Sequence, residues 1–183
     1  MKKIILAAAG LLTISSAAMA QTSANATQTV NLILANTIEL TFTGSGTATG
    51  TTVNLPFNTV SDYANGVTST DQQLKVRSNK NFGVTVKSNS ANFTYSGTTS
   101  PAPIMPVSGV LGLMVSANGT GGAVAAPFST STYATITGSN QNLLNTASNG
   151  GNQTFSVKYY ANPGFAYPAG TYTTDVVYTA TQL

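Results

Sequence analysis

Residues 30–42 read VNLILANTIELTF, and this stretch decides the fold because apolar side chains recur at every second position, interrupted only by Asn36. Side chains of a β-strand point alternately to its two faces, so a period of two places one row on a core and the other in solvent. The run is longer than a typical strand of about 5–6 residues. It predicts either two strands joined near Ala35-Asn36 or one strand that bends there and changes sheets. The apolar row consists of Val30, Leu32, Leu34, Ile38, Leu40 and Phe42.

The rest of the chain continues this β pattern. Thr, Val, Tyr and Phe dominate the apolar segments, and Gly, Asn, Ser and Pro separate them at short intervals. No segment beyond the first twenty residues has an apolar stripe of helical period, so we expect almost no helix. Residues 78–81 have the composition of a hairpin turn. Further strands are predicted at residues 52–57, 72–77, 82–87, 92–95, 110–115, 133–136, 153–160 and 171–181.

Eight or nine short strands at this spacing predict an all-β fold. We expect an antiparallel β-sandwich of Greek-key, immunoglobulin-like type, with a closed barrel as the alternative. Residues 21–183 are enough for one domain with its own core but not comfortably for two.

The first twenty residues have the organisation of a secretory signal peptide. Lys2 and Lys3 precede an apolar run, and Ala18 and Ala20 fit a cleavage site before Gln21. The apolar run is too short to cross a bilayer, and no later stretch approaches the roughly 20 apolar residues of a spanning helix. We therefore expect an exported protein without a membrane span, which passes through the periplasm to the cell surface or the medium.

The side chains that carry most enzyme chemistry are absent from the sequence. The chain has no His, Cys or Trp, and its carboxylates are scattered at Glu39, Asp62, Asp71 and Asp175. General acid–base and nucleophilic catalysis need an activating base near the reacting group. Without thiol or imidazole ligands, soft and borderline metal ions are excluded as well. We predict a protein that is not an enzyme, with no catalytic residue, no metal and no cofactor.

Charged residues are rare, at 6% of the chain. Once Lys2 and Lys3 leave with the signal peptide, five basic residues face four acidic ones, a net charge of about +1. Such a balance gives no electrostatic footprint for nucleic acid. A surface with so few charges opposes self-association weakly, so we expect a homo-oligomer or polymer.

An aromatic stretch near the C-terminus is the best candidate for ligand contact. Phe165 and Tyr167 lie with the same parity in a Pro- and Gly-containing segment, residues 161–169. Exposed aromatic rings stack on sugars, so these two residues are candidate contacts of a glycan-binding lip. The alternative is that they cap one end of the sandwich core.

The closing segment carries a family-like signature. Residues 170–177 read GTYTTDVV, a Gly-x-Tyr-x-x-Asp-x-Val pattern within an alternating strand. This pattern resembles the final strand of the spore coat protein U and archaic chaperone–usher pilin family of exported β-sandwich domains from Gram-negative bacteria. The chain lacks the cysteine pair usual in those pilins.

The resemblance implies assembly by strand donation, in which the N-terminal segment of one subunit completes the sandwich of the next. Residues 21–34 are then the donor, with Val30, Leu32 and Leu34 as its pocket-filling side chains, and a periplasmic chaperone is an expected partner. The alternative for residues 21–34 is the domain's own first strand. The expected function is a non-catalytic subunit of a bacterial surface fibre or pilus. The alternative function is a secreted or surface module for glycan binding and adhesion.

Overall fold

The computed structural model describes residues 23–43 and 52–183, and the chain divides into two units, Met1–Leu34 and Ala35–Leu183. The predicted signal peptide, residues 1–20, lies outside the described residues. Residues 23–34 form neither helix nor strand. The prediction of a strand from Val30 is therefore wrong, and the first strand begins at Ile38. Alternating apolar and polar residues suit a β-strand, but a strand also needs a neighbouring strand to pair with its backbone N–H and C=O groups.

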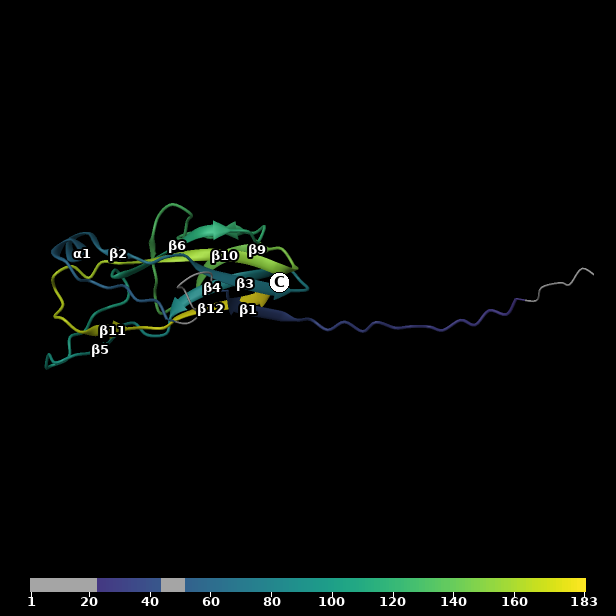
Figure 1. The fold of residues 1–183 in the computed structure, drawn as a ribbon, viewed down its shortest axis with the longest axis horizontal. Helices are drawn as coiled ribbons and strands as arrows, with labels where there is room; N and C mark the ends of the chain where they lie inside the picture. Colours follow the sequence, from purple (N-terminus) through teal and green to yellow (C-terminus); the bar gives the residue numbers. More distant parts are fainter. Residues whose placement is uncertain (1–22, 44–51) are drawn as a thin grey trace, which may run out of the picture. The chain divides into compact units, whose positions relative to one another are not determined.

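The unit Ala35–Leu183 contains two larger sheets and one small sheet (Figure 1). The first sheet has the order β1-β3-β10-β6-β8, with β2 also paired to β10, and the second has the order β12-β4-β9-β7. The small sheet pairs β5 with β11. The strands are β1 (Ile38–Phe42), β2 (Val67–Thr68), β3 (Gln72–Ser78), β4 (Phe82–Ser88), β5 (Thr94–Ser96), β6 (Leu111–Asn118), β7 (Ala123–Val124), β8 (Ala134–Thr135), β9 (Gln141–Ala147), β10 (Gly150–Ala161), β11 (Thr171–Thr173) and β12 (Val176–Gln182).

All strand pairs named here are antiparallel. The structure is 44% strand and 4% helix, which confirms the prediction of an all-β antiparallel fold. Its sheets are open, which favours the predicted sandwich over the closed barrel. The Greek-key and immunoglobulin-like details stay predictions.

The core lies between the two larger sheets and follows from the period-two pattern. On β3 and β4 every second residue is buried, and the residues between are half-buried or exposed. Burying one such aliphatic or aromatic side chain contributes about 1.5–3 kcal/mol. The largest fully buried side chains are Phe82, Phe155, Leu74, Leu113, Ile136, Leu143, Leu144, Val76, Val84, Val86, Val107 and Val115.

The predicted hairpin at residues 78–81 is wrong. β3 and β4 belong to different sheets, so this segment carries the chain from one sheet across to the other. The buried Ser78 pairs with the backbone of this crossing. Its hydroxyl donates to the Lys80 carbonyl at 2.6 Å and accepts from the Lys80 N–H at 3.2 Å. The alternating sequence on both sides is the same for a hairpin and for a crossing, and only the packing distinguishes them.

Two other predicted strands differ from the structure. Residues 171–181 split into β11 and β12, which belong to different sheets. Residues 52–57 form no strand, although Val53, Leu55 and Phe57 pack against the core. Pro56 within this segment has no N–H to donate to a ladder. β9 lies outside the predicted strands, and its pattern of buried residues is irregular.

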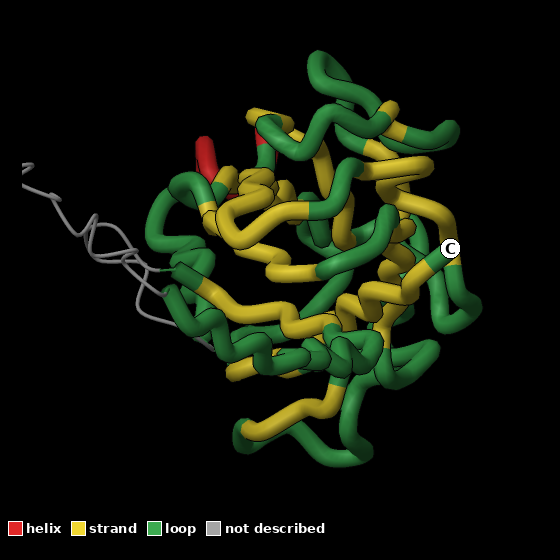
Figure 2. The backbone as a smooth tube through the Cα atoms, turned by 90° about the vertical axis from the view of Figure 1, so that its right-hand side faces the viewer, coloured by secondary structure: helices red, strands yellow, loops and turns green. Residues whose placement is uncertain are grey.

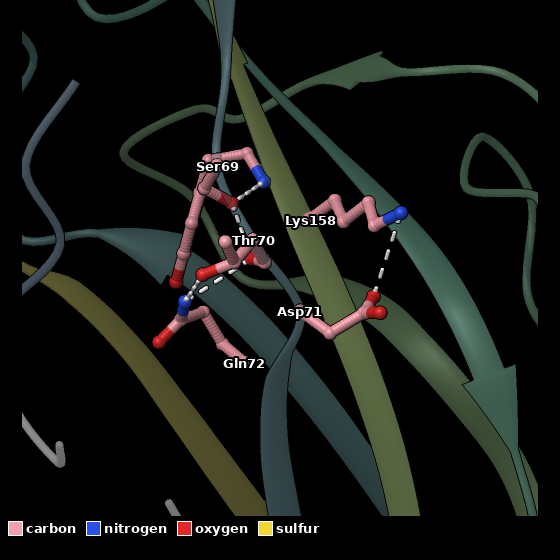
Figure 3. Close-up of polar contacts among 6 residues, drawn as sticks. Ser69, Thr70, Asp71, Gln72 and Lys158 are labelled. Atoms are coloured by element: carbon pink, nitrogen blue, oxygen red, sulfur yellow. Dashed lines mark hydrogen bonds and ion pairs between the residues drawn. The ribbon is translucent and has the colours of Figure 1, made fainter. Parts of the chain in front are cut away.

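A local bulge separates β2 from β3 along β10 (Figure 3). The Ser69 N–H donates to the Tyr159 carbonyl at 2.9 Å, and the Tyr159 N–H donates to the Ser69 hydroxyl at 2.9 Å. Gln72 Nε2 donates to the Thr70 carbonyl at 3.1 Å. These side chains satisfy backbone groups that a regular ladder would otherwise pair.

One polar pair joins the two larger sheets. The hydroxyls of Tyr159 on β10 and Tyr178 on β12 are 2.7 Å apart. Burial raises the pKa of Tyr159 to about 12, against an ordinary value of 10.0. Burial also raises the pKa of Tyr178 well above its ordinary value. Both phenols therefore stay protonated in the folded protein at pH values where an ordinary tyrosine side chain ionises.

We expect Tyr159→Phe and Tyr178→Phe each to lower the free energy of unfolding by about 1–3 kcal/mol, because each leaves the other hydroxyl without its partner. The double variant should lose little more than one single variant, since it removes both polar groups together. Urea unfolding of the four proteins measures this coupling. Additive losses in the double variant would contradict it.

Alkaline solution should destabilise the fold through the same pair. Between pH 10 and about 12 the unfolded chain has released the Tyr159 proton and the folded chain has not, so stability falls as pH rises through this range. A difference of two pKa units corresponds to about 3 kcal/mol. Urea midpoints at pH 9 and pH 11 should show a smaller drop in the double Phe variant than in the wild-type protein. Equal drops would assign the alkaline loss to other groups.

Candidate functional site

The edge strands β1 and β12 lie beside each other, one from each of the larger sheets (Figure 1). Within residues 23–43 and 52–183, β1 is hydrogen-bonded along its length to β3 only, and β12 to β4 only. Each strand therefore has one backbone edge without a ladder partner in the described chain. Such an edge presents unpaired N–H and C=O groups to another strand.

The apolar row at this edge is incompletely covered. The inward rows of the central strands β3 and β4 are buried, whereas those of β1 and β12 are half-buried or exposed. Phe42 keeps 39% of its surface exposed and meets Tyr178 edge to face, with ring centroids 6.0 Å apart. We call this surface the open edge; it consists of Ile38, Leu40, Phe42, Val176, Tyr178 and Ala180.

Side chains close one end of the open edge. Gln182 Nε2 donates to the Thr37 carbonyl at 2.8 Å and to Asn79 Oδ1 at 3.0 Å. Asn79 Oδ1 also accepts from the Thr37 N–H at 3.0 Å, and Asn79 Nδ2 donates to the Ala35 carbonyl at 2.8 Å. This network ties the start of β1 to the end of β12 without a backbone ladder between them.

The predicted donor residues lie in the other unit, where they are exposed. Val30, Leu32 and Leu34 expose 76%, 85% and 85% of their surface, and Ile33 between them exposes 94%. All four belong to the stretch 23–34 without regular structure. An exposed row of large apolar side chains often marks a site of interaction with another surface.

The predicted ligand contacts Phe165 and Tyr167 come together in one pocket. It has a volume of about 330 Å³ and is lined by Asn58, Thr59, Val60, Tyr63, Phe165 and Tyr167. We call it the aromatic pocket. Phe165 stacks on Tyr63, with ring centroids 5.6 Å apart and an interplanar angle of 24°. Tyr167 meets Tyr172 of β11 edge to face, with centroids 6.3 Å apart.

The helix that supplies Tyr63 was missed by the sequence analysis. It is α1 (Val60–Asn65), the short red element in Figure 2. Thr59 and Asp62 form its capping box: the Asp62 N–H donates to the Thr59 hydroxyl at 3.3 Å, and the Thr59 N–H donates to Asp62 Oδ2 at 2.7 Å. A Thr three residues before an acidic residue is the signal that predicts such a helix start.

The same carboxylate fixes the loop before the helix. Asp62 Oδ2 also accepts from the Asn58 N–H at 2.8 Å. These backbone hydrogen bonds, from Thr59 first and then Asn58, hold the pKa of Asp62 below its usual range. At the other end of the helix, the Tyr160 hydroxyl donates to the Asn65 carbonyl at 2.8 Å and anchors α1 to β10.

Two of the remaining carboxylates form ion pairs with separate partners. Glu39 pairs with Arg77 at 3.1 Å, and Asp71 pairs with Lys158 at 3.8 Å (Figure 3). Both pairs are substantially exposed, and such pairs contribute about 0–1 kcal/mol each. Residues 23–43 and 52–183 contain no group of three or more acidic, His or Cys side chains arranged to hold a metal ion.

In the part of the chain that the structure describes, no helix has the length and apolar character needed to cross a membrane. Neither a protein-family model nor a curated protein matches this sequence.

Proposed function

We propose that this chain is a non-catalytic structural subunit of a bacterial surface fibre, exported by its N-terminal signal and joined to neighbouring copies by β-strand donation. The observation that carries the proposal is the open edge, where β12 has no second ladder partner among residues 23–43 and 52–183 and lies beside a half-covered apolar row. A strand that paired with this edge would supply backbone hydrogen bonds and cover the row with its own side chains.

The N-terminal segment has the chemistry of such a strand. Val30, Leu32 and Leu34 alternate with Asn31 and Ile33, so a strand formed there would present three large apolar side chains on one face. β12 has seven residues, and residues 28–34 of a second copy match that length. Burying the three side chains contributes roughly 1.5–3 kcal/mol each.

The register follows from the same alternation. A slip of one residue would turn Val30, Leu32 and Leu34 toward water and bring Asn31 to the apolar row. A donated strand is therefore specified in register by its own sequence. The closing-strand resemblance to archaic chaperone–usher pilins supports this proposal, and a periplasmic chaperone that covers the open edge before assembly belongs to it.

The donor row gives a prediction with a matched control. Leu32→Asp should abolish fibre formation, because the carboxylate would have to be buried against the open edge. Ile33→Asp introduces the same charge at a side chain of opposite parity, and this variant should still assemble. Electron microscopy and size-exclusion chromatography of the exported proteins measure assembly. Equal effects of the two substitutions, or a wild-type chain that never associates, would contradict strand donation.

The acceptor side is tested in the same way. Ala180→Arg places a long charged side chain in the apolar row of β12, so we expect assembly to fail. Thr179→Arg, on the exposed face of the same strand, should leave assembly intact. Urea unfolding of each variant shows that its domain is folded. If both variants assemble like the wild-type protein, β12 is not the acceptor.

A further inference from the structure

We propose that the aromatic pocket binds a neutral sugar residue, whose apolar ring face stacks on Phe165 while its hydroxyls meet the polar side chains around it. This site does not rest on strand donation, because all of its residues belong to the unit Ala35–Leu183 and none belongs to the open edge.

The platform for the sugar is an exposed ring that the structure holds in place. Phe165 keeps 67% of its surface exposed although a large apolar side chain gains by burial. Tyr63 stacks on it, and Phe57 packs on Tyr63 with ring centroids 5.4 Å apart. Phe57 itself is packed against the core. A ring that is already ordered loses little entropy when a ligand stacks on it, and this favours binding.

Polar groups suited to sugar hydroxyls surround this platform. The Asn58 amide offers two donors and an acceptor, and the hydroxyls of Tyr63 and Tyr167 each offer a donor and an acceptor. Within the described residues these three groups form no side-chain hydrogen bond with the protein. The capping box uses the backbone N–H groups of Asn58 and Thr59 and leaves the Asn58 amide free for a ligand.

The chemistry of the lining selects the class of ligand. None of the six lining residues is charged, and the nearby carboxylate of Asp62, which accepts two backbone N–H groups at Oδ2, lies outside the lining. A phosphate, a carboxylate or an ammonium group would find no counter-charge among these residues. A purely apolar ligand would leave the amide and the phenols without partners. A neutral polyol with one apolar face satisfies both parts of the pocket.

The size of the pocket points to one sugar residue. Ligand pockets typically have volumes of about 300–1,000 Å³. The aromatic pocket, at about 330 Å³, lies at the small end of this range. We therefore expect the pocket itself to hold one sugar residue of a glycan.

The test measures sugar binding by the exported protein with ligand-observed saturation-transfer NMR and calorimetry. The probes are the methyl glycosides of glucose, galactose, mannose and N-acetylglucosamine, with N-acetylneuraminic acid as the charged comparison. We expect at least one neutral glycoside to bind, with its ring protons closest to the protein, and the charged sugar to bind more weakly. A protein that binds none of the neutral glycosides, or that prefers the charged sugar, overturns the proposal.

Substitutions then place the binding in the pocket. Phe165→Ala should weaken it at least tenfold, and Asn58→Ala and Tyr167→Phe should each weaken it severalfold. Ile104→Ala is the matched control, because Ile104 is 75% exposed and lies outside the pocket lining. Binding that Phe165→Ala leaves unchanged, or that Ile104→Ala lowers equally, overturns the assignment. If Phe165→Ala does not fold, the Asn58 and Tyr167 variants decide the question alone.

The two proposals are separated by one further measurement. The assembly variant Leu32→Asp should bind the same glycoside with the affinity of the wild-type protein, since its substitution lies outside the pocket. Loss of sugar binding in this folded variant would show that the site depends on assembly and would overturn a pocket contained within one subunit.

Discussion

The inward rows of the two larger sheets must cover each other, and the rest of the structure depends on this packing. Leu74 and Val76 of β3 and Phe82 and Val84 of β4 are at most 1% exposed, although only a short segment of chain separates the two strands. Each row is apolar on one face of its strand; β3 and β4 lie in opposite sheets, and each sheet needs the row of the other to cover its own. This requirement makes residues 79–81 a crossing and sets which strands occupy the edges.

At the open edge the two sheets no longer bury each other's inward side chains completely. β1 and β12 belong to different sheets and have no backbone ladder between them within the described chain. Their contact is made by side chains instead: Gln182 bonds the start of β1, Phe42 meets Tyr178, and Tyr178 shares a hydrogen bond with Tyr159. These side-chain contacts join the two edge strands at a few separate positions. A paired strand would form backbone hydrogen bonds along the whole edge and cover its apolar row. The half-buried row between those points is what a donated strand would cover.

The aromatic pocket depends on a different kind of support. Its loops carry few of the core residues, so they are positioned by local hydrogen bonds: Asp62 holds the backbone of Asn58 and Thr59, and Tyr160 holds the end of α1. Phe57 packs against the core, Tyr63 packs on Phe57, and Phe165 stacks on Tyr63. These contacts and hydrogen bonds hold Phe165 in place although its ring is largely exposed. None of the residues that line the aromatic pocket or form the open edge is charged.

The sequence by itself determined the fold class and most of the central strands. Period-two alternation located β3, β4, β6 and β10, because side chains of a strand with one buried face must alternate. The same alternation also ran through residues 30–34 and 52–57, which form no strand, since a strand exists only where a second backbone edge accepts its hydrogen bonds. Composition singled out Phe165 and Tyr167, but only the tertiary structure placed Tyr63 and Asn58 beside them. It also decided that β1 and β12 meet at an uncovered edge, because which strands become neighbours depends on packing between residues far apart in the chain.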